Sequence, residues 1–231
     1  MTSSDPQPHR DPLHMIAGLV IVAMLAFAGW LWRHGPLGPL PMHFNVHGAV
    51  DRWGDRTSLA EVEAATAVGF ALIYGVMIWM SRGLAPDAPA RRGQRAARLL
   101  LVCMGVMIGG LSAAMAYGDF SAPEGGGRRL MTAMLALLFL AVGALMGKAG
   151  PNPFVGMRSY WTFKSRLAWD KSNRLIGRLF FWIGAAALLA TPFVDPGIVT
   201  PALITAVILA TAAAFIEGLR VWRNDPERHL P

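Results

Sequence analysis

Six long apolar runs constrain the fold of this chain more than any other feature of its sequence. They cover Leu13–Trp32, Ala60–Met80, Ala97–Tyr117, Leu130–Gly147, Ile176–Phe193 and Val199–Leu219. Each has about 18 to 21 residues, enough for a helix to cross roughly 30 Å of hydrocarbon. Within lipid such runs satisfy their backbone groups as helices. The sequence therefore predicts an all-α integral membrane protein with six transmembrane helices, the fifth of which could begin earlier, near Arg174.

Composition supports this prediction and argues against a nucleic-acid-binding protein. Hydrophobic residues make up 54% of the chain and charged residues 15%, whereas soluble proteins carry about 25% charged residues. The net charge is +7, but the arginines cluster at the ends of apolar runs, where they orient membrane helices. The single cysteine, Cys103, lies inside such a run and cannot form an intrachain disulfide.

The distribution of Lys and Arg predicts the orientation. With the N-terminus inside, the outer side carries only five arginines, and the rest of the 21 Lys and Arg residues lie on the inner side. The outer arginines are Arg33, Arg52, Arg56, Arg128 and Arg129. This bias places both termini in the cytoplasm. The first apolar run lacks an A-x-A-like end, so we expect an uncleaved helix in the cytoplasmic (inner) membrane.

Four parts follow along the chain. We expect a cytoplasmic tail (1–12), a two-helix unit (13–80) with an outer loop (34–59), a cytoplasmic linker (81–96) and a four-helix unit (97–231). Within the last unit, residues 151–182 carry a distinctive sequence pattern, which begins in an unusual inner connection (Lys148–Asn173) and continues into the fifth apolar run. The other connections are rich in Pro, Gly and Ala and resemble spacers.

The outer loop contains two histidines and two aspartates that could bind a divalent metal: His43, His47, Asp51 and Asp55. The alternative is a polar loop, with turn-forming residues such as Asn45 and Gly48, held by hydrogen bonds. No Glu follows His43, so the HExxH pattern of metalloproteases is missing. We therefore expect neither a bound metal nor a cofactor.

The inner connection combines turn residues with aromatic and basic side chains. Asn152, Pro153 and Gly156 predict a turn, and Thr162 is predicted to be the N-cap of a following helix. Tyr160, Trp161 and Trp169 suit a membrane interface. These properties alone predict an interfacial segment that anchors the fifth transmembrane helix.

The order of residues in this connection resembles the signature of the SdpI family of membrane immunity proteins. The matching residues are Asn152, Phe154, Gly156, Met157, Arg158, Trp161, Thr162, Trp169, Arg174, Gly177, Arg178 and Phe180. The outer segment PMHFNVHGAVDRWG resembles a companion domain of unknown function, through Pro41, His43, Phe44, Asn45, Gly48 and Asp51. The chain departs from the signature at Ser159-Tyr160, where the family has Thr-Pro, and at Asn173, where His is frequent.

This resemblance implies a non-enzymatic protein that protects a bacterial cell from a secreted, membrane-active peptide toxin. The outer loop would meet the toxin, and the inner connection would signal to a small transcriptional repressor. Two alternatives stay open. One is a small transporter or channel. Against it, the expected helix interiors hold almost no ionisable residues, which usually mark an ion path, and Glu61 and Glu63 lie near a membrane end. The other is a metal-dependent membrane enzyme that uses the residues of the outer loop.

Overall fold

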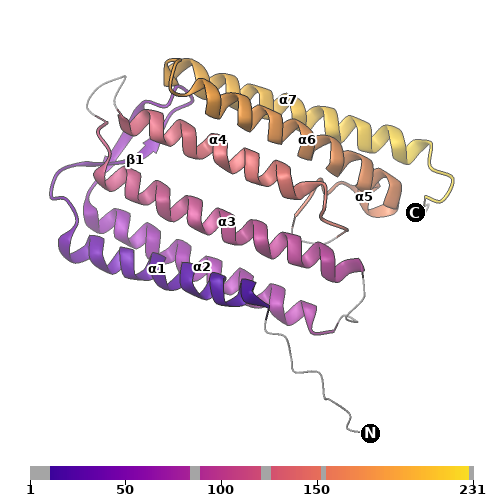
Figure 1. Ribbon diagram of the computed structural model, residues 1–231, viewed down its shortest axis with the longest axis horizontal. Helices are drawn as coiled ribbons and strands as arrows, with labels where there is room; N and C mark the ends of the chain where they lie inside the picture. Colours follow the sequence, from indigo (N-terminus) through magenta and orange to yellow (C-terminus); the bar gives the residue numbers. More distant parts are fainter. Residues whose placement is uncertain (1–10, 84–88, 121–125, 152–154, 229–231) are drawn as a thin grey trace, which may run out of the picture.

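The computed structural model describes residues 11–83, 89–120, 126–151 and 155–228. Within these ranges the chain forms helices and one small hairpin (Figure 1). The helices are α1 (Pro12–His34), α2 (Arg56–Ser81), α3 (Pro89–Tyr117), α4 (Gly126–Met146), α5 (Tyr160–Lys164), α6 (Arg166–Ala190) and α7 (Pro196–Arg223). The two strands of the hairpin are β1 (Leu40–Phe44) and β2 (Val50–Gly54).

All helices except the short α5 are long and apolar enough to span a membrane, so the predicted six-span fold is confirmed. Large apolar side chains also cover much of the outer surface. Leu19 and Val22 of α1, Leu72 of α2 and Ile208 of α7 are each more than 60% exposed. Soluble proteins rarely expose such continuous apolar surface, whereas lipid accommodates it.

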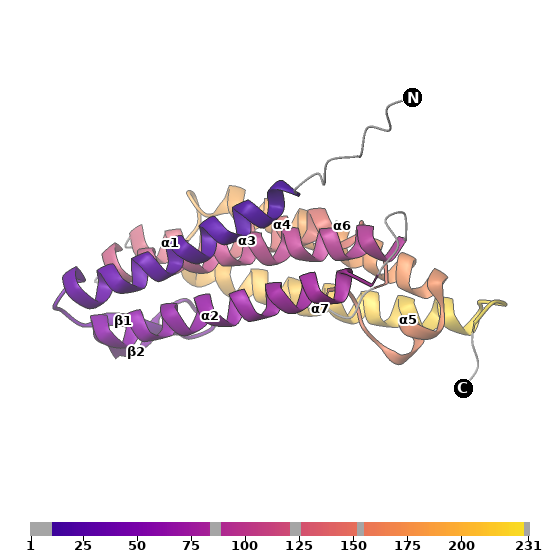
Figure 2. The ribbon, with the colours of Figure 1, turned by 90° about the horizontal axis from the view of Figure 1, so that it is seen from below.

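The six long helices run side by side and alternate in direction (Figures 1 and 2). The β1–β2 hairpin and the α6–α7 turn lie at one end of the bundle, which we call the hairpin end. The α4–α6 connection, which contains α5, lies at the opposite end together with the beginning of α1 and the end of α7. We call this the elbow end, and residues 147–165 the elbow. Lys and Arg placement predicts that the elbow end is cytoplasmic.

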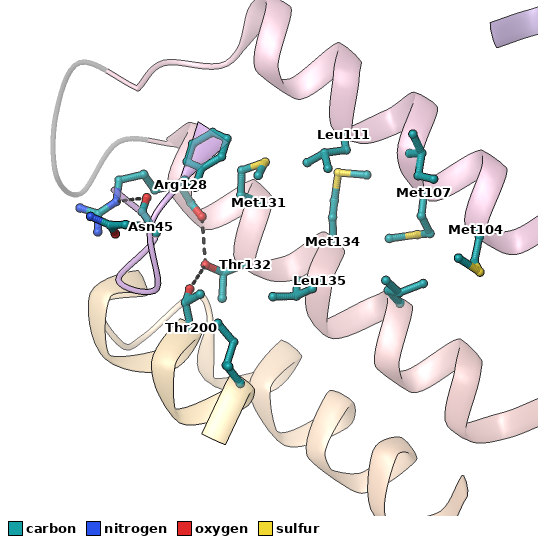
Figure 3. A pocket seen from close by; sticks show the side chains of 15 residues that line it. Asn45, Met104, Met107, Leu111, Arg128, Met131, Thr132, Met134, Leu135 and Thr200 are labelled. Carbon is teal, nitrogen blue, oxygen red and sulfur yellow. Dashed lines mark hydrogen bonds between the residues drawn. The ribbon is translucent and has the colours of Figure 1, made fainter. Parts of the chain in front are cut away.

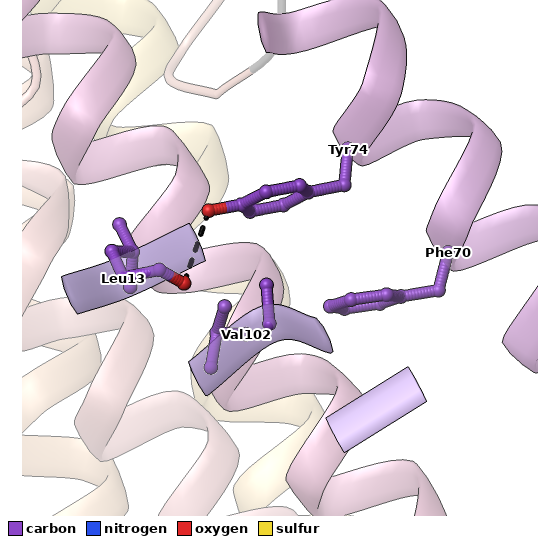
Figure 4. Packing of buried hydrophobic residues seen from close by; sticks show 5 residues of the cluster. Leu13, Phe70, Tyr74 and Val102 are labelled. Carbon is purple, nitrogen blue, oxygen red and sulfur yellow. Dashed lines mark hydrogen bonds between the residues drawn. The ribbon is translucent and has the colours of Figure 1, made fainter. Parts of the chain in front are cut away.

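Helices α1, α2 and α3 share one apolar core. Leu13, Phe70, Tyr74 and Val102 are buried together, and Figure 4 shows the rings of Phe70 and Tyr74 on neighbouring turns of α2. The Tyr74 hydroxyl donates a hydrogen bond to the Leu13 carbonyl at 3.2 Å. An aromatic ring with a polar tip thus fastens the first turn of α1 to α2.

Helices α4, α6 and α7 share a second core, built on close backbone approach. Gly143 of α4 lies against Gly177 and Phe181 of α6, and a side chain at Gly143 would meet the α6 backbone. Gly184 makes a similar contact with Leu140 and Ala136. Such small residues let membrane helices pack closely, and dispersion contacts then stabilise the pair.

The hairpin was not expected from the apolar runs, because its strands are only five residues each. The strands pair in antiparallel fashion, with Leu40 opposite Gly54 and Phe44 opposite Val50. Leu40 and Pro41 face inward and are buried, while Asp51 and Arg52 face solvent. The small sheet is stabilised because its buried side packs on the helix ends.

The arginines at the hairpin end do more than orient the chain. Arg56 donates to the Gly35 carbonyl at 3.2 Å, and Arg128 donates to the His47 and Gly48 carbonyls at 2.8 and 3.0 Å. Arg129 donates to the Thr191 and Pro192 carbonyls in the α6–α7 turn at 2.7 and 3.0 Å. These side chains therefore satisfy backbone acceptors that the helix ends and turns leave open.

Candidate functional site

The elbow is organised around a glycine in an unusual conformation. Gly156 has a φ of +132°, which side-chain-bearing residues rarely adopt. A Cβ at this position would lie 2.8 Å from both the Asn173 amide oxygen and the Trp169 ring. The next residue, Met157, donates its backbone N–H to that same oxygen at 2.7 Å. Only glycine allows the chain to pass this close to α6.

Trp169 and Asn173 hold the elbow from the side of α6, and both are almost fully buried. The Trp169 indole N–H donates to the Ala149 carbonyl at 3.0 Å. The Asn173 amide donates to the Trp169 carbonyl at 2.9 Å while its oxygen accepts from Met157. Two side chains one turn apart therefore satisfy backbone groups on both arms of the elbow.

The position of Thr162 corrects the sequence prediction. The N-cap of α5 is Ser159, and Thr162 is the third helical residue of a reciprocal capping box. The Thr162 hydroxyl accepts the Ser159 N–H at 2.9 Å and donates to the Met157 carbonyl at 2.8 Å. The prediction missed this arrangement because Ser and Thr both cap helices, and their spacing of three suits a capping box in either role.

A second cap separates α5 from α6. Ser165 has an extended backbone, and its hydroxyl accepts the Ala168 N–H at 2.9 Å. It also donates to the buried carboxylate of Asp225, which follows α7. The helix of the fifth membrane span therefore begins at Arg166, well before the predicted Ile176 or Arg174. Hydropathy did not indicate its first turns because they are polar. These turns are part of the helix because they pack against the elbow.

Trp161 connects α5 to α7. Its ring meets Phe215 edge-on, with 4.5 Å between ring centroids. A Cβ on Gly218 would lie 3.1 Å from the Trp161 indole nitrogen, so this glycine makes room for the ring. That indole nitrogen is buried, with no hydrogen-bond partner among the described residues. Trp161 therefore packs as an apolar wedge between α5 and α7.

Among the remaining signature residues, Phe180 is buried in the core of α4, α6 and α7, one glycine is tightly packed and three arginines are exposed. Gly177 lies at the α4–α6 contact, where its missing side chain leaves room for the Gly143 carbonyl. Arg174 and Arg178 are exposed on α6, and Arg158 is exposed beside a groove formed by α2 and α3. The predicted signature residues Asn152 and Phe154 lie outside the described residues.

The outer-loop residues build the hairpin. Pro41 is buried in β1, and the Asn45 side chain accepts the N–H groups of His47 and Ala49 at 2.9 and 3.1 Å. Gly48 closes the turn with a φ of +71°. The pattern that predicted a companion domain thus describes a strand followed by a turn that is capped by its own side chain.

The four weak metal candidates do not share one centre. His43 and Asp51 pair across the hairpin, with 2.6 Å between Nδ1 and a carboxylate oxygen. Asp55 caps α2 and accepts the Ser58 N–H at 2.7 Å, and this hydrogen bond lowers the pKa of the Asp55 carboxyl. Within the described ranges, no group of three His, Cys, Asp or Glu side chains is placed to hold one metal ion.

An apolar cavity lies between the hairpin and helices α3, α4 and α7. Its volume is about 260 Å³. Figure 3 shows methionines from α3 and α4 along its length and a polar chain at its mouth. There the Thr132 hydroxyl donates to the Arg128 carbonyl at 3.1 Å and lies 2.9 Å from the Thr200 hydroxyl. The lining residues are Phe44, Asn45, Gly48, Met104, Met107, Ile108, Leu111, Arg128, Met131, Thr132, Met134, Leu135, Leu138, Thr200 and Ile204.

Glu63 is a buried carboxylic acid that the sequence reading placed near a membrane end. It lies two turns inside α2, about 10 Å from the helix start at 1.5 Å per residue, and is 0% exposed. The Ser112 hydroxyl of α3 donates to one of its oxygens at 2.6 Å, and the other oxygen has no partner among the described residues. The sequence did contain a signal for this buried acid, because Glu63 is an ionisable residue within an apolar run.

Comparison with known proteins finds a family match for one segment near the C-terminus. Residues 148–217 match the model of the SdpI/YfhL protein family, while no curated protein and no solved structure matches the chain. The match covers the elbow, α6 and most of α7, and it confirms the resemblance inferred from the signature. The hairpin lies outside it, so its resemblance to a companion domain stays a prediction. The chain is therefore a multi-pass membrane protein that carries a segment matching the SdpI/YfhL family at residues 148–217.

Proposed function

We propose that this protein protects a bacterial cell from a secreted, membrane-active peptide, and that it does so without enzymatic activity. The observation that carries the proposal is the methionine-lined cavity under the hairpin. It lies at the hairpin end, which the charge distribution predicts to face outward from the cytoplasmic membrane. A toxin that approaches from outside would meet this end of the protein first.

The chemistry of the cavity suits an apolar side chain of a peptide. Met104, Met107, Met131 and Met134 line it, and methionine adapts its shape to different apolar partners. At the mouth, the hydroxyls of Thr132 and Thr200 and the amide of Asn45 provide polar groups for a peptide backbone. We infer that the hairpin and the cavity together form the surface that binds the peptide.

The experiment compares cells that carry or lack the gene during challenge with a panel of membrane-active peptides. We expect loss of the gene to increase sensitivity to at least one peptide. In complemented cells, Leu111→Trp should fill the cavity and reduce protection. Val106→Trp is the matched control, because Val106 is on the same helix and 55% exposed to lipid. Equal protection by both variants would exclude the cavity as the binding surface.

The elbow is the proposed contact for a small repressor on the cytoplasmic side. Tyr160, Phe163 and Leu167 are each about half exposed at the elbow end. Arg166 is also exposed, beside Asp170 in a surface ion pair at 3.6 Å. Aromatic and arginine side chains are enriched where proteins bind each other. Crosslinking from Phe163 in peptide-treated cells tests for such a partner, and unchanged crosslinks after treatment would contradict a signalling role.

Glu63 favours a second candidate function, which is proton-coupled transport. Carboxylic acids inside a membrane bundle often mark a proton path, and Glu63 joins α2 to α3 through Ser112. Purified protein in vesicles with an imposed pH gradient would distinguish the two functions. Transport should acidify the vesicle interior at a rate that Glu63→Gln abolishes. If the parent protein leaves the gradient unchanged, this second candidate is excluded.

A further inference from the structure

A groove runs between α4 and α6 at the elbow end, on the surface that faces lipid. It has a volume of about 520 Å³. Gly143, Gly147 and Gly177 line it, and the close approach of the two helices at these glycines forms its floor. Ala144 adds only a methyl group. The groove is therefore shallow and smooth, as an extended hydrocarbon chain requires.

Positive charge lines one end of this groove. Lys171, Arg174 and Arg178 follow one another on α6 at spacings of three and four, and therefore share one helix face. Lys148, just after α4, faces them from the other side of the groove. All four side chains are exposed, and none forms a salt bridge to a carboxylate in the part of the chain that the structure describes.

Polarity changes in order along the groove. The cations give way after Arg178 to Phe181 and Trp182, and Trp182 is exposed. From Lys171 to Trp182 the helix rises about 16 Å at 1.5 Å per residue. A phospholipid presents the same order, with phosphate at the interface and hydrocarbon below. An arginine exposed to lipid is costly unless its side chain reaches the headgroups or an anion meets it.

We propose that this groove binds one anionic phospholipid of the cytoplasmic leaflet. The headgroup phosphate lies among Lys148, Lys171, Arg174 and Arg178, where guanidinium groups donate paired hydrogen bonds to its oxygens. One acyl chain follows the glycine floor toward Trp182. Basic pockets between membrane helices on the cytoplasmic side suit such headgroups. The bound lipid neutralises the cations and covers the glycine contact between α4 and α6.

The test uses the full-length protein purified in a neutral detergent. Native mass spectrometry and thermal unfolding are recorded with added phosphatidylglycerol, with phosphatidylcholine and with inorganic phosphate. We expect phosphatidylglycerol alone to bind selectively and to raise the melting temperature, because a ligand of the folded state stabilises it. Arg174→Gln/Arg178→Gln should weaken this binding about tenfold or more, since each cation near an anionic lipid contributes about 1 kcal/mol.

Two further variants separate a built site from general surface charge. Arg220→Gln/Arg223→Gln removes the same charge from α7 at the same end and should leave binding unchanged, because both arginines are exposed outside the groove. Ala144→Phe keeps every charge but fills the groove and should also weaken binding. Mass spectrometry reads occupancy on the folded fraction, so a variant that folds poorly still gives a result.

Several outcomes would overturn the proposal. If Arg220→Gln/Arg223→Gln weakens phosphatidylglycerol binding as much as Arg174→Gln/Arg178→Gln does, the attraction is a diffuse one to a negative surface. If phosphatidylcholine binds as well as phosphatidylglycerol, the headgroup charge is irrelevant. If inorganic phosphate raises the melting temperature as much as phosphatidylglycerol does, the cations bind a free anion and not a lipid. Unchanged lipid binding in Arg174→Gln/Arg178→Gln, with loss of a cytoplasmic crosslink, would assign the groove to a protein partner.

Discussion

Most of the signature residues at the elbow stabilise the turn of the chain between two membrane spans. Trp169 and Asn173 are buried and satisfy backbone groups of Ala149 and Met157, and Gly156 permits the close approach. Thr162 and Ser159 then start the next helix. These residues act inside the fold, so the signature describes how the chain turns between two membrane spans. Arg158, Arg174 and Arg178 are the signature cations that lie exposed.

The first prediction concerns Gly156. Gly156→Ala forces a side chain into a backbone conformation with a φ of +132° and places its Cβ 2.8 Å from Trp169 and Asn173. Backbone strain of this kind costs on the order of 1–3 kcal/mol before the clash is counted. We expect a lower melting temperature in detergent and less folded protein in the membrane.

Gly29→Ala is the control for this substitution. Gly29 lies within α1, and a Cβ there meets nothing within 4 Å. Alanine favours the helix over glycine by about 1 kcal/mol, so this variant should be as stable as the parent or more so. If both variants melt at the parent temperature, the tight turn at Gly156 does not stabilise the elbow.

Capping residues set where the helices begin. Asp11, Asp55, Ser159, Ser165 and Asp195 each accept a backbone N–H at the start of a helix. Between the two elbow helices, Ser165 ends one and starts the next at a single residue. Each cap satisfies one of the N–H groups that the first turn leaves open. Four of the six spans, α1, α2, α6 and α7, therefore begin at a short polar side chain.

The second prediction uses the cap of α2. Hydrogen bonds from the Ser58 N–H and hydroxyl lower the pKa of the Asp55 carboxyl from its usual 3.8. Because the pKa is lower in the folded state, the stabilisation is complete above the unfolded pKa and is lost as pH falls through the folded pKa. Asp55→Asn keeps a capping oxygen but cannot titrate. The difference in melting temperature between parent and Asp55→Asn should shrink as pH falls from about 7 to about 3.

Glu61→Gln provides the control for the pH series. Glu61 is exposed on the same helix, and the cap of α2 is Asp55, not Glu61. We expect this variant to follow the melting curve of the parent across the pH range. A constant difference between the parent and Asp55→Asn at every pH would mean that the charge of Asp55 does not contribute to capping.

The whole molecule has two chemically different ends. At the hairpin end, Arg56, Arg128 and Arg129 are directed at backbone carbonyls, which they satisfy. At the elbow end, Lys171, Arg174 and Arg178 remain exposed along one helix. Exposed cations on α6 at one end, and arginines directed at backbone carbonyls at the other, accompany the charge asymmetry that orients membrane proteins.

The third prediction is the orientation itself. In a Cys103→Ser background, Arg52→Cys places a thiol in the hairpin and Arg166→Cys places one at the elbow, and both positions are exposed. In intact cells, a membrane-impermeant maleimide should label Arg52→Cys and spare Arg166→Cys until the membrane is permeabilised. Labelling in the reverse order would place the hairpin in the cytoplasm and remove the proposed contact with an external peptide.

The sequence by itself determined the class of fold, the six spans and the family of the C-terminal segment. Apolar length and charge placement are local properties, and lipid leaves helices as the main solution for such runs. It also located the outer loop and the inner connection as the two unusual connections. Their residue types were visible, but Thr162 was assigned the role of Ser159, because both roles suit a short hydroxyl side chain.

Only the tertiary structure decided which of these residues meet. The cavity collects side chains from the hairpin, α3, α4 and α7, and no local pattern encodes that convergence. Glu63 is buried because neighbouring helices pack around it, and Ser112 of α3 donates a hydrogen bond to it at 2.6 Å. The cationic groove exists because three glycines bring α4 and α6 together beside two lysines and two arginines. Packing between helices depends on shape across the bundle, which hydropathy along one chain does not contain.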